Sequence, residues 1–262
     1  MKLKIYQIDA FAEKVFEGNP AAVIPLQNWL PDEIMQKIAL ENNLSETAFF
    51  VSVETGFHIR WFTPVAEVDL CGHATLATAH VLFNHLNYAE NEISFQSRSG
   101  ILKVKKERDL IVLDFPASKI SEIEIPENLK STFNIQPIKC IKGRDDLMLF
   151  FENEEDITNL KPDFQKIIQS KTRGVIVTAK SEKYDFVSRF FAPAVGVNED
   201  PVTGSAHTML IPFWSKELGK NKMIAKQVSA RGGILHCKNL GERVEIGGKA
   251  VTFLVGEIIL YS

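Results

Sequence analysis

No stretch of this chain is apolar enough, over the roughly 20 residues that a helix needs, to span a bilayer. The amino-terminal segment Met1–Tyr6 enters an alternating strand pattern at once, and it shows neither the apolar core nor the cleavage site of a secretory signal. Cysteine is scarce: the three thiols, Cys71, Cys140 and Cys237, are odd in number and widely scattered, which favours reduced thiols over a disulfide framework. We therefore predict a cytoplasmic protein with no membrane partner.

Motifs that bind phosphates or metals are also missing. The chain contains neither a G-x-x-x-x-G-K-[ST] loop nor a G-x-G-x-x-G turn, so the sequence gives no support for a nucleotide cofactor. None of the six histidines falls into an H-x-x-x-H pair, and no two cysteines have the spacing of a metal site. The net charge of -3 and the pI near 6.1 provide no basic surface for nucleic acid. We predict no cofactor, no metal and no nucleic-acid partner.

What the chain does contain is an internal repeat. The segment Arg60–Pro64 (RWFTP) recurs as Arg189–Pro193 (RFFAP) at a spacing of 129 residues, and Cys71–Ala74 (CGHA) recurs as Thr203–Ala206 (TGSA) at a spacing of 132. The second copy therefore has three extra residues between its proline and its helix. A fold duplicated within one chain puts its shared site at the seam of the copies, so the repeat indicates where function is to be sought.

The order of predicted elements is the same in both halves, with a strand, a helix, a strand, a buried helix and further strands. The buried helices are predicted from the alanine-rich run Ala74–Leu86 and from a run that begins at Ser205 and ends near Trp214. We therefore predict an α+β fold of two domains related by a pseudo-two-fold axis, each a β-barrel-like sheet wrapped around a central helix. The predicted domains are residues 1–116 and 117–262, with the last strand free to return to the first domain.

The loops before the two buried helices are surrounded by the candidate functional residues. Free backbone N–H groups and the positive end of the dipole make a helix N-terminus bind anions, carboxylates in particular. Two such ends facing one cleft would bind a small acid and stabilise an enolate-like charge without a cofactor. The proton carriers and hydrogen-bond donors around them are Glu46, Cys71, His73, Asp200 and Ser205. Schiff-base chemistry through a lysine stays open, although neither loop contains a lysine.

Each of these residues also has a purely structural interpretation. Glu46 is placed to cap a turn, Cys71 to pack as a small hydrophobe, and His73 to lie in the core as a satisfied polar group. Ser205 is a common helix cap, and Asp200 before a proline is a common turn former. Taken singly, the structural interpretations are the stronger ones, whereas their occurrence together at duplicated positions favours function. A helix N-terminus is also where the pKa of a thiol falls, which would make Cys71 useful as a thiolate.

Five motifs along nearly the whole chain carry a resemblance to a known family. They are Asp9–Phe11 (DAF), Gly18–Ala21 (GNPA), Asn43–Thr47 (NLSET), Phe62–Pro64 with Asp69–Ala74 (FTP and DLCGHA), and Glu199–Ala206 (EDPVTGSA). With these motifs the chain resembles the phenazine-biosynthesis F (PhzF-like) isomerases, a branch of the diaminopimelate epimerase-like fold. The resemblance implies two similar domains, a homodimer and no cofactor.

The resemblance also implies roles for single residues. The family's catalytic glutamate falls on Glu46, and its histidine after glycine falls on His73. We expect the catalytic residues to be Glu46, His73 and Asp200, and the substrate-binding residues to be Ser205, Gly72, Gly204 and Cys71. The family's glutamate moves a proton between ring carbons of a dihydro-hydroxyanthranilate, and the reaction class transfers better than the substrate. The expected activity is that of an isomerase acting on a small carboxylic acid, amino or cyclic, by general acid/base catalysis.

Two other functions stay open. A racemase or epimerase needs two bases across one carbon, and in the epimerase relatives that the resemblance implies both symmetric positions are cysteines. The other is a non-catalytic protein that keeps the cleft for a small acid. With the three extra residues placed just before Gly204, Asp200 becomes the repeat partner of Cys71. We therefore expect Glu46 to be the principal base, with Asp200 or His73 its partner, and this asymmetry favours moving a proton from one carbon to another.

Overall fold

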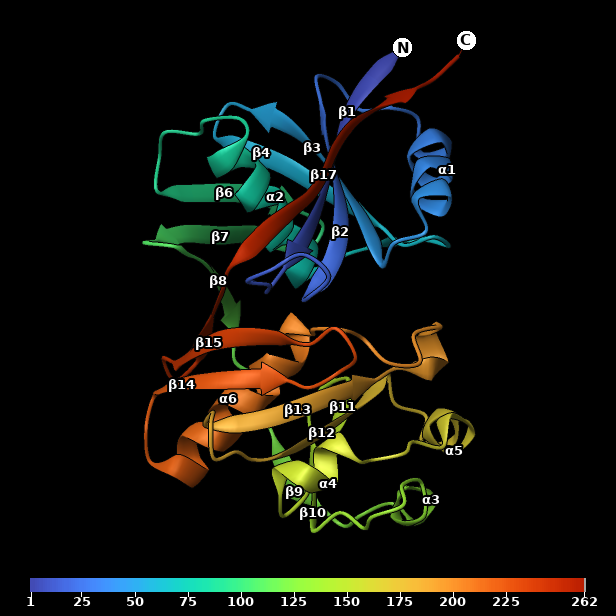
Figure 1. Cartoon of the computed structure of the whole chain (residues 1–262), viewed down its shortest axis with the longest axis vertical. Helices are drawn as coiled ribbons and strands as arrows, with labels where there is room; N and C mark the ends of the chain where they lie inside the picture. The colour runs from blue at the N-terminus through green and yellow to red at the C-terminus, as the bar shows by residue number, and fades with distance from the viewer. Residues whose placement is uncertain (262) are drawn as a thin grey trace. The chain divides into compact units, whose positions relative to one another are not determined.

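The computed structural model describes residues 1–261 of the chain, which divide into two compact units (Figure 1). The first unit consists of Met1–Asp114 and of the segment from Gly247 onward, and the second consists of Phe115–Ile246. The last strand, β17 (Ala250–Ile259), pairs antiparallel with the first, β1 (Lys2–Ala10), as the red and blue ribbons of Figure 1 show. The two ends of the chain therefore belong to the same unit.

The first unit contains one sheet and two helices. Its remaining strands are β2 (Asn19–Leu26), β3 (Glu46–Val53), β4 (Gly56–Phe62), β5 (Glu67–Val68), β6 (Glu92–Ser97), β7 (Gly100–Glu107) and β8 (Leu110–Pro116). Along the sheet the order is β17, β1, β2, β3, β4, β6, β7, β8, and β5 pairs with β4. Helix α1 (Asp32–Asn42) connects β2 to β3, and α2 (Gly72–Asn84) lies between β5 and β6 in the chain.

The second unit repeats this design. Its strands are β9 (Ser121–Ile123), β10 (Lys139–Lys142), β11 (Asp146–Phe150), β12 (Gly174–Lys180), β13 (Phe186–Phe191), β14 (Lys222–Gln227), β15 (Gly233–Asn239) and β16 (Arg243–Gly248). Its helices are α3 (Glu127–Lys130), α4 (Glu154–Thr158), α5 (Phe164–Gln169), the short 3₁₀ helix η1 (Pro193–Val195) and α6 (Gly204–Leu218). From β9 to β15 each strand pairs with the next in the chain.

Both sheets show the same succession of strand directions. In the first unit the strands β1, β2, β3, β4, β6 and β7 pair antiparallel, parallel, antiparallel, parallel and antiparallel. The strands β10 to β15 of the second unit pair in the same succession. Each parallel pair is connected through a helix, because parallel strands need a crossover. The predicted α+β fold with two similar units is confirmed.

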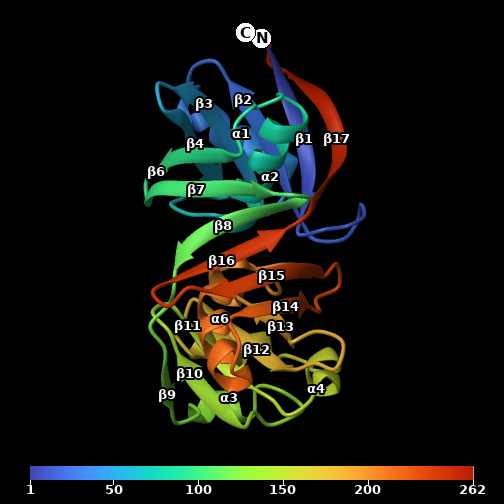
Figure 2. The ribbon, with the colours of Figure 1, turned by 90° about the vertical axis from the view of Figure 1, so that its left-hand side faces the viewer.

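Helix α2 is enclosed by strands of its own unit. Ten of its 13 residues are buried, and it contacts β1, β2, β3 and β17. Figure 2 shows strands of the first unit on both sides of it. The hydroxyls of Thr75 and Thr78 donate to the backbone oxygens of Cys71 at 2.6 Å and Ala74 at 2.8 Å, so these buried polar groups are satisfied. The helix begins at Gly72, earlier than predicted, because Cys71 already has the extended backbone of a cap.

Helix α6 is the corresponding helix of the second unit. It runs past the predicted end near Trp214. The prediction ended the helix too early because exposed polar residues follow Trp214. The helix continues to Leu218, and the left-handed backbone of Gly219 (φ 65°) ends it. Inside the unit, Nε1 of Trp214 donates to the hydroxyl of Thr178 at 2.9 Å. The indole is thereby both buried and hydrogen-bonded, which fixes the helix against β12.

The two longest helices, α6 with 15 residues and α2 with 13, are shorter than the roughly 20 residues that span a bilayer. Within residues 1–261, no helix is long and apolar enough to cross a membrane. The cytoplasmic location and the homodimer stay predictions.

Candidate functional site

The first unit brings Glu46 and His73 together. Glu46 is the first residue of β3, and His73 is the second residue of α2. Nε2 of His73 lies 3.0 Å from Oε2 of Glu46, the distance of an ion pair, and both side chains are largely buried. Oε2 is itself fully buried, and no hydrogen-bond donor in residues 1–261 is aimed at it. The carboxylate is thus close to a charge partner but keeps a free lone pair.

Cys71, the residue that caps α2, is the third member of this cluster. Its Sγ lies 3.6 Å from Nδ1 and 4.0 Å from Nε2 of His73. Burial, with a smaller contribution from Glu46, raises the pKa of the Cys71 thiol to about 11. The expectation that the helix N-terminus would make Cys71 a ready thiolate is therefore wrong, because the cost of burying the charge outweighs the helix dipole.

The pKa of the His73 imidazole is also raised, which in this case favours the charged form. Burial on its own lowers the pKa of His73, but Cys71 and Glu46 outweigh it and hold the pKa well above its usual value. His73 therefore carries a proton at neutral pH beside the predicted base.

Asn19 supports His73 from the other side of the ring. Its Nδ2 lies 3.3 Å from Nδ1 of His73, and its Oδ1 accepts from the hydroxyl of Ser45 at 3.4 Å. Because a hydroxyl both donates and accepts, the amide can also turn its oxygen to a protonated Nδ1 and keep its contact with Ser45. Asn19 is fully buried at the start of β2. The sequence motif at Gly18–Ala21 contains it, but sequence analysis assigned it no role.

Asp200 lies in the second unit, within a network at the cap of α6. The hydroxyl of Thr203, the cap residue, donates to Oδ2 of Asp200. Oε1 of Gln227 accepts from the backbone N–H of Thr203 at 2.9 Å, and Nε2 donates to the backbone oxygen of Asp200 at 2.7 Å. Gln227 is fully buried at the end of β14. This network fixes the loop that carries Asp200, and sequence analysis missed Gln227 because it lies 24 residues beyond Thr203.

Ser205 of α6 is held by an arginine that sequence analysis also missed. Nη2 of Arg173 donates to Oγ of Ser205 at 3.2 Å. Arg173 is itself fixed by two hydrogen bonds to Asp146, one of them from Nε to Oδ1 at 2.9 Å. Since a guanidinium only donates, Oγ of Ser205 accepts this bond and its own O–H is left to donate.

The two units use the same three places in the fold for these contacts. The places are the first residue of a strand, the loop before the parallel neighbouring strand, and the second residue of the buried helix. They carry Asn19, Ser45 and His73 in the first unit, and Asp146, Arg173 and Ser205 in the second. The repeat has therefore diverged chemically: these places carry an amide, a hydroxyl and an imidazole in the first copy, and a carboxylate, a guanidinium and a hydroxyl in the second.

The structure corrects the predicted repeat partner of Cys71. Cys71 caps α2 and Thr203 caps α6, each directly before the glycine that begins the helix, Gly72 or Gly204. Thr203, and not Asp200, is therefore the counterpart of Cys71. The three extra residues lie further forward, in the turn that includes η1 and closes with a bridge between Ala192 and Val197.

The predicted site residues thus form two groups. Glu46, Gly72 and His73 lie together with Cys71 in the first unit, and Asp200, Gly204 and Ser205 lie in the second. That both groups act on one substrate stays a prediction.

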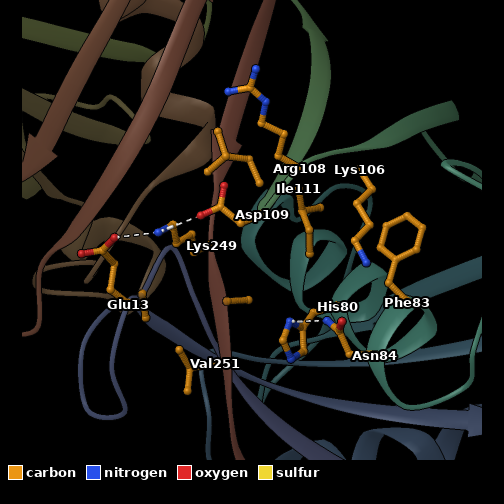
Figure 3. A pocket seen from close by; sticks show the side chains of 13 residues that line it. Glu13, His80, Phe83, Asn84, Lys106, Arg108, Asp109, Ile111, Lys249 and Val251 are labelled. Carbon is orange, nitrogen blue, oxygen red and sulfur yellow. Dashed lines mark hydrogen bonds and ion pairs between the residues drawn. The ribbon is translucent and has the colours of Figure 1, made fainter.

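A cavity of about 470 Å³ in the first unit lies apart from these residues (Figure 3). Figure 3 shows one of its two lysines, Lys249, between the carboxylates of Glu13 and Asp109, at 3.1 Å and 2.9 Å. On the other side lies His80, whose pKa is lowered to about 4 by burial, with smaller effects of His85 and Lys106. None of the residues that the sequence motifs predict for the active site lines this cavity, and we do not assign the activity to it.

Sequence comparison identifies the family. A family model of phenazine biosynthesis-like proteins matches residues 8–256. The chain belongs to this family. An uncharacterised isomerase of Pseudomonas aeruginosa is 50% identical over 260 residues, which cover 99% of this chain and 100% of that protein. A human phenazine biosynthesis-like domain-containing protein is 41% identical over 286 residues, which cover 98% and 99%.

Solved structures agree with this membership. The crystal structure of a PhzF-family protein of Enterococcus faecalis matches with a TM-score of 0.97 and 47% identity, covering 99% of this chain and 100% of that one. A hydroxyproline epimerase of Agrobacterium vitis, 8% identical, matches with a TM-score of 0.64 over 98% of this chain and 92% of its own, which shows the fold alone. The resemblance read from the sequence motifs is confirmed, and the family supports an isomerase or epimerase role.

Proposed function

We propose that this chain is a cofactor-independent isomerase that moves a proton on a small carboxylic acid, amino or cyclic, by general acid/base catalysis. Glu46 is the base that takes the proton from carbon, and His73 is its partner. Family membership supports the reaction class. The roles of the two residues rest on the geometry of the first unit.

The observation that carries the proposal is the environment of Oε2 of Glu46. This oxygen is buried without a hydrogen-bond donor in the described chain, while the proton-carrying His73 lies 3.0 Å away. A carboxylate oxygen with a free lone pair, in a site that holds little water, is suited to accept a proton from carbon. The imidazolium beside it offsets the negative charge before the transfer and has a proton to return afterwards.

In the second unit we propose that Asp200 is a further proton carrier and that Ser205 donates to the substrate's carboxylate. The bond from Arg173 leaves the Ser205 hydroxyl as a donor. Gly72 and Gly204 begin α2 and α6, where free N–H groups favour an anion.

An amino-acid racemase or epimerase is the second candidate, favoured by Cys71 lying beside Glu46 and His73. Two observations count against a two-thiol mechanism. The cap of the matching helix is Thr203, whose hydroxyl is a far weaker base than a thiolate, and burial keeps the Cys71 thiol protonated. The isomerase therefore ranks first.

The test is deuterium incorporation from D₂O, followed by NMR, into a panel of small cyclic and amino acids incubated with the protein. We expect at least one acid to exchange at carbon, and Glu46→Gln to lower the rate by about 10²- to 10⁴-fold. Glu41→Gln, which removes an exposed carboxylate of α1, is the matched control and leaves the rate unchanged.

The panel also separates the competing functions. Exchange with loss of stereochemistry at one carbon would favour the epimerase, whereas deuterium at a carbon other than the one deprotonated favours the isomerase. An acid that binds wild type and Glu46→Gln equally, and never exchanges in folded protein, would show a binding protein and refute the catalytic proposal.

A further inference from the structure

We propose that Glu46, Cys71 and His73 form a binding site for a thiophilic divalent cation, with zinc the best match, and that the bound ion blocks this part of the proposed active site. The metal-binding property goes beyond the proposed isomerase and does not depend on it. Sequence spacing alone gave no metal site, because Glu46 lies 25 positions before Cys71 and joins it only through the fold.

The donor set is the one that zinc prefers. A thiolate sulfur, an imidazole nitrogen and a carboxylate oxygen are its common protein ligands, and three protein ligands with an open fourth position are typical of zinc sites that bind a further molecule. One ligand atom from each of the three residues lies within 4.8 Å of the others. Hard cations such as Mg²⁺ are disfavoured, because they prefer oxygen ligands only.

The distances are close to those of a tetrahedral site. Bonds of about 2.3 Å to sulfur and about 2.0–2.1 Å to nitrogen or oxygen place the ligand atoms about 3.3–3.6 Å apart. Nε2 of His73 lies 3.0 Å from Oε2 of Glu46 and 4.0 Å from Sγ of Cys71. The three ligand atoms lie within 4.8 Å of one another, so the side chains must draw together, Sγ of Cys71 most of all, to seat the ion.

The burial of Oε2 of Glu46 is a further observation that favours a ligand. This oxygen is fully buried with Nε2 of His73 as its ion-pair partner at 3.0 Å, so a lone pair is left for a cation or a substrate proton.

Asn19 and Ser45 provide the outer contacts that a zinc-bound histidine requires. When Nε2 binds the metal, Nδ1 keeps its hydrogen and needs an acceptor. The amide of Asn19, 3.3 Å away, can present its oxygen to Nδ1 and its Nδ2 to the Ser45 hydroxyl. The contacts of Asn19 with His73 and with Ser45 are both kept in this arrangement.

The test uses Co²⁺ as a spectroscopic substitute for Zn²⁺ in the chelator-treated full chain. We expect one Co²⁺ per chain, a thiolate-to-cobalt charge-transfer band, and loss of that band on addition of one equivalent of Zn²⁺. Cys71→Ser is expected to abolish the band and weaken Zn²⁺ binding by about 100-fold or more. Cys140→Ser and Cys237→Ser, which change buried thiols of the second unit, are the matched controls and leave both unchanged.

A wild-type protein that is folded by circular dichroism but gives no band, or a band that survives in Cys71→Ser, overturns the proposal. So does Zn²⁺ binding that weakens equally in Cys71→Ser and Cys140→Ser. Inhibition of deuterium exchange by one equivalent of Zn²⁺, reversed by EDTA, supports the blocking of the site. The cobalt titration needs no substrate, so a failure of the isomerase proposal leaves its outcome readable.

Discussion

Nε2 of His73 lies 3.0 Å from Oε2 of Glu46, yet this buried oxygen receives no hydrogen bond in the described part of the chain. The imidazole acts on the carboxylate through its charge, and a lone pair of this oxygen is left for a proton. Such a carboxylate can still remove a proton from carbon, because the proton must bind to this lone pair. The cost of keeping a carboxylate oxygen unbonded in the interior indicates function, because a structural role would be served by a direct bond.

Replacing His73 by asparagine should remove the proton that sits beside Glu46. The raised pKa of His73 means that the imidazolium persists at neutral pH and loses its proton only at higher pH. We therefore expect the wild-type exchange rate to fall on the alkaline side, and His73→Asn to lower the rate about 10²-fold or more and to lack this alkaline limb. Deuterium exchange measured from pH 6 to about 10 checks both effects.

His236→Asn is the control for this substitution, because His236 is half-buried on β15, outside the cluster. It should leave the rate and the pH profile unchanged. An alkaline limb that is identical in wild type and His73→Asn would assign the titrating group to another residue.

The sequence repeat predicted the fold well but misplaced the insertion. Nε and Nη2 of Arg60 donate to Glu67, both at 2.7 Å, and Arg189 makes the same pair of bonds to Glu199 at 2.7 and 2.9 Å. The arginines are 129 residues apart and the glutamates 132, so the extra residues lie before Glu199. The motifs on either side of a loop fix its length, but only the bidentate pairs show which part of the loop is longer.

The catalytic candidates could be read from short motifs, whereas their supporting residues could not. Asn19 meets His73 across 54 positions, and Arg173 meets Ser205 across 32. These contacts depend on the register of parallel strands, with Ala21 opposite Glu46 in the first unit. Local hydrophobic periodicity identifies a strand but not the residue opposite it, so partners of this kind appear only in the folded chain.

Arg173 is expected to set the affinity for the substrate carboxylate. Arg173→Lys keeps the charge but loses the fork that holds Asp146 and reaches Ser205. The Ser205 hydroxyl then has no fixed donor and becomes free to turn inward, so we expect KM for the exchanging acid to rise about 10-fold while kcat changes by less than about 3-fold. Initial rates of exchange over a range of acid concentrations measure the two constants.

Arg144→Lys is the matched control, because Arg144 is exposed and pairs with its neighbour Asp145. It should leave both constants unchanged. A fall in kcat at constant KM in Arg173→Lys would instead place Arg173 in the chemical step.

Gln227 is expected to matter for both stability and activity. Gln227→Leu fills a similar volume but removes the hydrogen bonds that Gln227 makes to the backbone N–H of the buried Thr203 and to the backbone oxygen of Asp200. The free energy of unfolding should fall by about 2–3 kcal/mol, and the exchange rate should fall because the Asp200 loop is no longer fixed. Urea unfolding and deuterium exchange check the two effects.

Gln96→Leu, an exposed glutamine of β6, provides the comparison and should change stability by less than about 0.5 kcal/mol. Gln227→Glu keeps the acceptor for Thr203 but places a buried carboxylate against the backbone oxygen of Asp200, so it should destabilise the fold at least as much as Gln227→Leu. Full activity in a destabilised Gln227→Leu would mean that the position of Asp200 is not needed for turnover.

His207 of α6 should make the free energy of unfolding depend on pH. It is fully buried, with Nδ1 bonded to the backbone oxygen of Thr203 at 2.8 Å, and burial lowers its pKa to about 4. The unfolded chain binds a proton near pH 6.5 and the folded one only near pH 4, so this histidine stabilises the fold above pH 6.5 and loses that contribution as the pH falls. The free energy of unfolding should therefore drop between pH 6.5 and 4, by at most about 1.4 kcal/mol per pH unit from this group.

Urea unfolding of wild type and His207→Gln at several pH values from 7 to 4 measures this slope. The variant should be less stable at pH 7, but its free energy of unfolding should fall less steeply on acidification, by up to about 1.4 kcal/mol per pH unit. A slope should remain because the pKa of His80 is also lowered to about 4. His236→Asn serves as the control and should follow the wild-type slope. Parallel curves for wild type and His207→Gln would show that His207 takes up its proton in the folded protein as readily as in the unfolded chain.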